Sequence, residues 1–189
     1  MSNFSEGCSL VAATKVKLKD GRTVLVRELR LEDRDKLVEM YASLSGEALR
    51  WGMPPYTKEV VERWLSNLQN LITLVAFYDN RIVGDAHIHK FPHQRRKGTS
   101  DLVIYLHQDF HNVGLGTAML TRLVELARKE GLHRIGLSVI ADNEKAVHVY
   151  QKVGFKIEGV LKESYFGEDG EYHDELVMGL VFISSTSPS

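Results

Sequence analysis

Cysteine is almost absent from this sequence, since Cys8 is the only one among 189 residues. A single thiol can form neither an intrachain disulfide nor a cysteine-based metal site. The chain therefore carries no sign of an oxidising compartment, and we expect it to reside in the cytoplasm.

An excess of charge of either sign is also lacking. The 24 Lys and Arg residues are balanced by 25 Asp and Glu residues, which gives a formal net charge of −1 and a pI near 6.7. A protein that coats nucleic acid needs a basic surface, so we expect no direct nucleic-acid binding.

Long hydrophobic runs are missing as well. No apolar stretch reaches the length of a membrane span, and the first residues lack the basic flank and apolar core of a signal peptide. We therefore expect no membrane partner. No spacing of His, Cys, Asp or Glu predicts a metal site, and no Ser/His/Asp or Cys/His nucleophile motif is present.

The residues that are present fit one globular domain. Hydrophobic residues make up 43% of the sequence, which suffices for a sizeable core at this length. Residues 1–14 and the tail 184–189 are small, polar and aperiodic, so we predict flexible ends around a single domain of residues 15–183.

Hydropathy patterns within the domain alternate between strand and helix. Three hairpins are predicted around the turn sequences Asp20-Gly21, Asp79-Asn80 and Glu168-Asp169-Gly170. Helical spacing predicts four helices, between Leu31 and Leu44, after Thr57, after Gly114 and after Asp142 or Asn143. The order is two strands, two helices, three strands, a helix, a strand, a helix and two strands. This order predicts a mixed α/β sheet, in which a helical crossover allows a parallel pair.

The stretch from Ser100 to Met119 concentrates the functional signal. Its first half predicts a strand and helical spacing begins at Gly114, so a glycine loop joins the strand to a helix N-terminus. Gly114 and Gly116 leave backbone N–H groups open to a ligand, and the first helical turn adds unpaired donors and the positive end of the helix dipole. Such a loop suits a phosphate or pyrophosphate. It is not a dinucleotide G-x-G-x-x-G, because its last position is Met119, and no Walker lysine follows Gly116.

The loop resembles the acetyl-CoA signature Q/R-x-x-G-x-G/A of the GNAT superfamily of N-acetyltransferases. It reads His111-Asn112-Val113-Gly114-Leu115-Gly116, with His in the first position in place of Gln or Arg. A second signature of the family is similar to Asn143-Glu144-Lys145-Ala146 followed by Tyr150-Gln151-Lys152-Val153-Gly154-Phe155. The resemblance covers residues 15–183 and implies the GNAT fold. It also implies acetyl-CoA as co-substrate, bound by Leu106, His111, Asn112, Val113, Gly114, Leu115, Gly116, Thr117, Asn143 and Tyr150.

Acetyl transfer to an amine needs a general base. A lysine amine has a reference pKa of about 10.4 and is protonated near neutrality. By resemblance, Asp101 stands where many GNAT members carry a Glu that acts as the base, although the same residue would also simply end a polar loop at the strand entry. His87 and His89 lie two residues apart on the preceding strand and share a face, so either could contact substrate instead of serving the surface or core.

The resemblance also implies groups for the intermediate and the leaving group. Backbone N–H groups near Leu106 are the expected donors to the oxyanion. The leaving group is a thiolate, to which the Tyr150 phenol could donate a proton or a hydrogen bond. Packing is the alternative role of Tyr150, because it shares a helical face with Ala146 and Val153. Asn143 either contacts the pantetheine arm or caps the helix.

The two ends of the domain resemble different GNAT members. LKDGRTVLVRELRLEDRDKL with LSGEALRW is similar to protein-acetylating members of the Pat type, whereas FGEDGEYHDELVMGL resembles members that acetylate amino acids or small amines. We expect a protein lysine as acceptor in a ternary complex, with an amino acid or small amine as the alternative. A catalytically silent CoA-binding module is a third possibility. The acidic tip Glu168, Asp169 and Glu171 could attract a lysine or simply form a tight turn.

Overall fold

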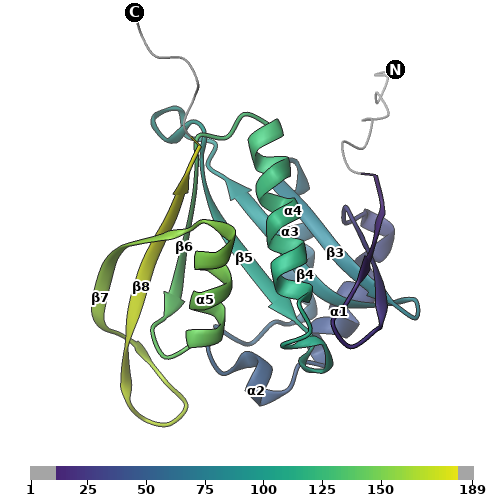
Figure 1. The fold of residues 1–189 in the computed structure, drawn as a ribbon, viewed down its shortest axis with the longest axis horizontal. Coiled ribbons are helices and arrows are strands. Elements are labelled where there is room, and N and C mark those ends of the chain that lie inside the picture. The colour runs from purple at the N-terminus through teal and green to yellow at the C-terminus, as the bar shows by residue number, and fades with distance from the viewer. Residues whose placement is uncertain (1–11, 183–189) are drawn as a thin grey trace, which may run out of the picture.

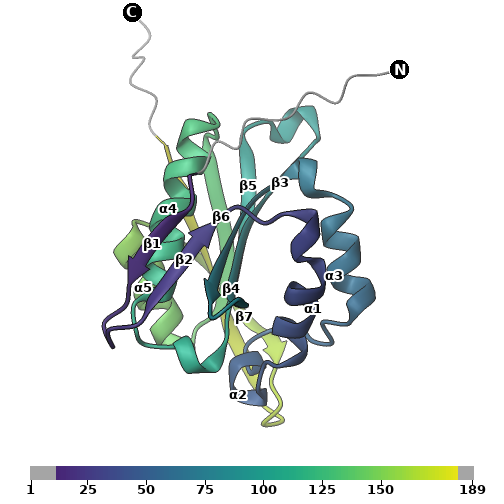
Figure 2. The same cartoon turned by 90° about the vertical axis from the view of Figure 1, so that its right-hand side faces the viewer.

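Within residues 12–182, eight strands form one sheet, and helices cover both of its faces (Figures 1 and 2). The computed structural model describes residues 12–182, so Cys8 and most of both predicted flexible ends lie outside the described residues. The strands are β1 (Thr14–Lys17), β2 (Thr23–Arg27), β3 (Leu71–Tyr78), β4 (Arg81–Lys90), β5 (Thr99–Leu106), β6 (Arg134–Ile140), β7 (Lys156–Phe166) and β8 (Tyr172–Val181). The helices are α1 (Arg34–Ala42), α2 (Gly46–Leu49), α3 (Lys58–Leu65), α4 (Leu115–Lys129) and α5 (Glu144–Val153). Among the described residues, no helix is both long and apolar enough to cross a membrane.

The strand order across the sheet is β1-β2-β3-β4-β5-β6-β8-β7. Among the described strands, only β5 and β6 pair in parallel, because the α4 crossover returns the chain to the end of the sheet where β5 began before β6 starts. The other pairs are antiparallel, and β8 inserts between β6 and β7, so the α5 crossover produces no second parallel pair. The predicted mixed α/β sheet and its order of elements are confirmed.

Several boundaries differ from the sequence prediction. Residues 31–33 form a short 3-10 turn in which Leu31 is 68% exposed, so the regular helix begins only at Arg34. The short helix α2 was not predicted, because four residues are too few to show helical periodicity. The turn at Asp79 and Asn80 has positive φ at both residues, as a two-residue hairpin turn requires.

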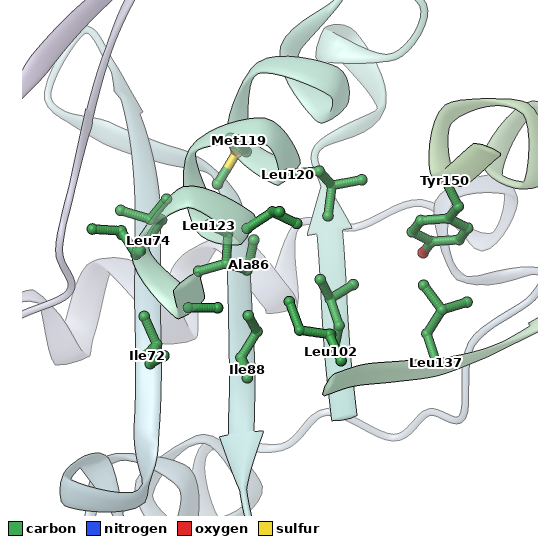
Figure 3. Close-up of a cluster of buried hydrophobic side chains, with 14 of the residues drawn as sticks. Ile72, Leu74, Ala86, Ile88, Leu102, Met119, Leu120, Leu123, Leu137 and Tyr150 are labelled. Carbon is green, nitrogen blue, oxygen red and sulfur yellow. The ribbon is translucent and has the colours of Figure 1, made fainter. Parts of the chain in front are cut away.

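The larger core lies between the sheet and α4 (Figure 3). The side chains that meet there come from alternate positions of the strands and from one face of the helix: Ile72, Leu74, Ala86, Ile88, Leu102, Met119, Leu120 and Leu123. Burial of one such large apolar side chain stabilises the fold by about 1.5–3 kcal/mol. This packing fixes the start of α4 relative to the end of β5.

A second core lies on the opposite face of the sheet, beneath α1 and α3 (Figure 2). Leu37 and Met40 of α1 and Val61 of α3 are its most buried helical residues. The strand positions on this face include Asp85 and His87 of β4, which are themselves buried. The two faces of the sheet are therefore chemically different, since among the described strand residues the buried Asp85 carboxyl and His87 imidazole both lie on this face.

Candidate active site

The sheet forks between β5 and β6. The two strands pair only where Thr99 to Asp101 meet Arg134 to Gly136. Beyond Asp101, β5 continues along β4 while β6 continues along β8, and the two strands diverge (Figure 1). A cleft of about 1780 Å³ opens at this fork and reaches both faces of the sheet.

The loop before α4 forms one end of the cleft. Gly114 has a left-handed φ of 91°, which turns the chain into the helix at a position that disfavours any side chain. Ala118 is the first residue whose N–H bonds back into the turn, to the Gly114 carbonyl at 3.1 Å. In residues 12–182 no acceptor is found for the N–H groups of Leu115, Gly116 and Thr117. The loop therefore presents several free donors at the positive end of a helix dipole, which suits an anion.

A lysine that the sequence analysis did not single out lies over this loop. The N–H of Lys19, in the β1–β2 turn, donates to the Val113 carbonyl at 3.0 Å. Its side-chain carbons pass 3.6–3.9 Å from where a Cβ on Gly114 would lie, and Lys19 lines the cleft. Its ammonium forms no ion pair with the part of the chain that the structure describes, so Lys19 could add positive charge to the anion site. No local pattern predicts this contact, because the two segments meet only in the folded sheet.

His111 and Leu106 connect the loop to the end of β5. The His111 Nε2 donates to the Leu106 carbonyl at 3.0 Å, so the side chain in the first position of the motif ties the loop to the last residue of β5. The His107 N–H bonds to the Val83 carbonyl of β4 at 3.0 Å. Antiparallel alternation then directs the Leu106 N–H away from β4 and toward the fork. This orientation is the one that an oxyanion donor near Leu106 needs.

The other predicted loop residues divide between cleft and core. His111, Asn112, Gly114, Gly116 and Thr117 line the cleft. Val113 and Leu115 do not, since Leu115 is completely buried and Val113 packs against the same core. If these two residues contact a ligand, they do so only through their backbone.

The start of α5 forms the opposite wall. The Asn143 Oδ1 accepts from the Ala146 N–H at 3.3 Å, so the predicted capping role is confirmed, and Asn143 also lines the cleft. Asp142 is not the cap and pairs with His173 instead. Gly154 ends the helix with a left-handed φ of 114°.

Tyr150 of α5 is buried yet borders the cleft, where it lies near Leu137 of β6 (Figure 3). Within the described residues its hydroxyl makes no hydrogen bond, and burial raises its pKa to about 12. An ordinary thiol has a pKa near 8.5. A phenol so much less acidic keeps its proton, which makes Tyr150 better suited to donate a hydrogen bond to a thiolate than to protonate it.

Asp101 lies at the point where the fork begins. It is exposed, lines the cleft and pairs across the sheet with His89 on one side and Gly136 on the other. Its Oδ1 would lie 3.0 Å from a Cβ on Gly136, so the glycine leaves room for the carboxylate. Cross-strand partners share a face, so Asp101 lies on the α1 and α3 face, opposite α4 and α5. Of the two strand histidines, only His87 lines the cleft.

Aromatic side chains surround the cleft on this second face. They come from the α2–α3 segment, α3, β5 and β7, and they are Trp51, Tyr56, Trp64, Tyr105 and Tyr165. The hydroxyls of Tyr56 and Tyr105 hydrogen-bond to each other, and burial raises the pKa of Tyr105 further above its ordinary value. The sequence analysis missed this group because its members share no spacing and meet only through the fold.

On this face, contacts between the α2–α3 segment and the β7–β8 hairpin bridge the rim of the cleft. The Tyr165 hydroxyl lies 3.0 Å from the Arg50 carbonyl and 2.9 Å from the Gly52 carbonyl. Arg50 also pairs with Asp169 at 3.4 Å, and the Trp51 ring packs edge-on against His173. Both views place α2 beside the hairpin (Figures 1 and 2).

His173, on the hairpin side of the bridged rim, binds two aspartates. Its Nε2 lies 3.0 Å from the Asp169 Oδ1 and its Nδ1 lies 2.6 Å from the Asp142 Oδ2. Hydrogen bonds to Asp169 and Asp142 raise the pKa of His173, because they favour the doubly protonated ring. Asp169 of the predicted acidic tip is therefore engaged by His173 and Arg50 and is not free to attract a lysine.

The fold and the cleft together place an anion-type glycine loop on one face of a forked sheet and an aromatic pocket on the other. Residues 36–155 match the acetyltransferase (GNAT) family, and the chain belongs to this family. It is 27% identical over 159 residues to the L-amino acid N-acetyltransferase AaaT of Escherichia coli strain K12, a match that covers 84% of this chain and 98% of the relative.

Solved structures of acetyltransferases have the same fold as this chain. A GNAT-family acetyltransferase from Streptococcus pneumoniae superposes with a TM-score of 0.74 and 30% identity, over 84% of this chain and 99% of that one. The yncA acetyltransferase of Salmonella typhimurium, solved with its cofactor acetyl-CoA, has a TM-score of 0.74 and 20% identity over 88% and 98% of the two chains. The predicted family, fold and co-substrate are confirmed: the chain is an acetyl-CoA-dependent N-acetyltransferase that acts on an amine. In residues 12–182, no group of three or more His, Cys, Asp or Glu side chains could hold a metal ion.

Proposed function

We propose that this enzyme acetylates the primary amine of a free amino acid or another small amine. The bridged rim is the observation that carries the proposal. A lysine within a polypeptide needs an open groove for the chain on both sides of it, whereas a small acceptor needs only the pocket. The contacts of Tyr165 with Arg50 and Gly52 join the α2–α3 segment to β7 at the rim of the cleft, which leaves a closed rim in place of an open groove there. The similarity to an amino-acid acetyltransferase over nearly its whole length supports the same class of acceptor.

A protein lysine, the acceptor expected from the opening of the sequence, is the second candidate. The similarity of residues 18–37 to Pat-type members favours it. This acceptor requires the rim to open, which would break the Tyr165 hydrogen bonds and the pairing of Arg50 with Asp169.

The two acceptor classes are separated by incubating the purified enzyme with labelled acetyl-CoA. One set of reactions holds single L-amino acids and small amines, and the other holds a cell lysate that is resolved afterwards into protein and small-molecule fractions. We expect label in one or more small amines and none in protein above the no-enzyme background. Label confined to protein would overturn the small-acceptor proposal in favour of the lysine.

We assign the steps of transfer to residues on the two sides of the fork. The loop from His111 to Thr117, together with Lys19, binds the phosphates of acetyl-CoA. Asp101 takes one proton from the acceptor ammonium, the neutral nitrogen then forms a bond to the thioester carbonyl carbon, the carbon–sulfur bond breaks, and the second amine proton passes to solvent. The Leu106 N–H stabilises the oxyanion of the intermediate, and the Tyr150 hydroxyl donates a hydrogen bond to the departing thiolate, which takes its proton from solvent.

The glycine loop makes a prediction for cofactor binding. Acetyl-CoA at one hundred times its Kd should stabilise the native protein by about 2.7 kcal/mol and raise its melting temperature. Gly116→Val should abolish that rise, because the added side chain fills the cradle beside the Leu106 side chain, 3.3 Å from the new Cβ. The variant should still fold, since the crowded atom is the movable end of that leucine. Thermal denaturation with and without acetyl-CoA measures both effects.

Gly159→Val is the matched control. Gly159 lies on β7 away from the cleft, and a Cβ there meets no atom within 4 Å. This variant should keep the full response to acetyl-CoA. A folded Gly116→Val protein that also keeps it would remove the loop as the phosphate site.

A further inference from the structure

Three buried polar side chains beneath the acceptor side of the cleft have no role in the steps described above. The Tyr41 hydroxyl of α1 donates to the Asp85 Oδ2 at 2.8 Å, and the His87 Nδ1 lies 3.1 Å from the same oxygen. The three residues are only 3%, 2% and 8% exposed. Burying a carboxylate is costly unless it is paired, and within residues 12–182 the Tyr41 and His87 contacts reach only Oδ2 of Asp85, while Oδ1 is buried without a partner.

The hydrogen bonds fix the orientation and the tautomer of His87. Burial, together with the neighbouring Asp85 charge, raises the pKa of Tyr41 well above its ordinary value, so its hydroxyl keeps the proton that it donates to Asp85. The carboxylate of Asp85 accepts, so the His87 Nδ1 must carry a proton. The other ring nitrogen, Nε2, is then the atom that can accept a hydrogen bond. The Trp64 ring, whose centroid lies 5.8 Å from that of His87, limits rotation of the imidazole.

His87 stands beside the open part of the fork. It pairs across the sheet with Val103 of β5, two residues beyond the point where β5 and β6 separate. It lines the cleft on the face that also carries Asp101. Its Nε2 has no hydrogen-bond partner anywhere in residues 12–182. The buried partners hold the His87 ring in place, and its Nε2 is left without a donor among the described residues beside the cleft. This arrangement suits a hydrogen bond from a donor on the substrate.

An amine acceptor brings such donors. It arrives as an ammonium. After Asp101 removes one proton, the nitrogen still carries N–H groups that can donate hydrogen bonds. For attack, the remaining N–H groups must be held so that the lone pair points at the thioester carbon. We propose that the Nε2 of His87, held by Asp85 and Tyr41, accepts a hydrogen bond from the acceptor amine and orients its lone pair for attack. This assignment rests on the proposed function and adds to it a residue that contacts the acceptor.

The test compares pH profiles of kcat/KM on a small amine that the wild type acetylates. His87→Leu removes the accepting nitrogen, and we expect about a tenfold loss, in line with the loss of one hydrogen bond to the acceptor. The loss should be constant from about pH 7.5 to 9.5, because a residue that orients the amine does not supply the proton sink. His87→Gln should recover most of the activity, since its amide oxygen can accept the same hydrogen bond.

The titratable groups around the ring must be accounted for in reading these profiles. They are Asp85 and His89 on the same strand, Tyr41 on α1, and Asp101 and Tyr105 on the same face of β5; β3 and α3 contribute the uncharged Thr73 and Trp64. All of them are unchanged in the two His87 variants, so the ratio of wild type to variant isolates His87.

His89→Leu is the matched control. His89 lies on the same strand and face but does not line the cleft, so its loss should leave kcat/KM unchanged. The response of the melting temperature to acetyl-CoA verifies that each variant is folded. Full activity of His87→Leu would overturn the assignment. A loss of kcat/KM that shrinks as pH rises would overturn it too, because that behaviour would identify His87 as the base. A wild type that acetylates no amine would instead refute the proposed function and the assignment together.

Discussion

Replacing Tyr150 with Phe is expected to lower kcat by about 10²- to 10³-fold, the usual cost of removing one donor to a developing negative charge in a water-poor site. Tyr150 is 9% exposed, and its hydroxyl has no partner among the described residues, so it is free to donate to the thiolate. Phe fills the same space and preserves the packing against Phe155. The affinity for acetyl-CoA should therefore change little.

The raised pKa of Tyr150 adds a second expectation. With a pKa of about 12, the hydroxyl keeps its proton throughout the working range, so wild-type kcat should show no loss from tyrosine ionisation up to about pH 9.5. Single-turnover kinetics measure the chemical step, and Tyr172→Phe, an exposed tyrosine on β8, is the control. A nearly normal chemical step in Tyr150→Phe would return Tyr150 to a packing role.

Asp101→Asn is expected to reduce kcat/KM by about 10²-fold near neutral pH, within the range typical of general-base catalysis. Asparagine keeps the size of the side chain, and Gly136 still leaves room for it, but the amide cannot accept the amine proton. As pH rises toward the amine pKa, more of the acceptor is already neutral. The ratio of wild-type to variant kcat/KM should therefore fall between about pH 6.5 and 9.5.

The way in which the ratio of wild-type to variant kcat/KM changes with pH decides the role of Asp101. A flat ratio would mean that the carboxylate only positions substrate, and no loss at any pH would place Asp101 at the strand entry with no part in catalysis. Asp35→Asn, an exposed aspartate on α1, controls for the change of charge and should match the wild type. The two experiments should differ in their pH dependence, since the Asp101→Asn deficit should shrink as pH rises whereas the His87→Leu deficit should stay constant.

The secondary structure was largely predictable because its signals are local. Asp79 and Asn80 adopt the positive φ values that hairpin turns need, and Gly154 ends α5 as expected. Asn143 caps that helix through its own side chain. The short helix α2 and the 3-10 turn at Leu31 were missed, because elements of three or four residues have no period to detect.

The CoA side of the site was also predictable, because its donors are consecutive backbone groups of one loop. A glycine at position 114 permits the left-handed conformation, and the helix that follows leaves its first N–H groups unpaired. The motif could not distinguish which side chains face the cleft, however. Leu115 and Val113 belong to the core, since their helical and loop positions point toward the sheet.

The sequence alone determined the order of elements, the phosphate-type loop and the family, because each of these depends on residues that are near one another along the chain. The acceptor side was decided only by the tertiary structure. Tyr41, Asp85 and His87 come together because α1 packs on β4, and Tyr165 reaches Arg50 because the β7–β8 hairpin folds back across the α2–α3 segment. Contacts between segments so far apart in the chain depend on how strands order and helices pack, and no local pattern of residues encodes them.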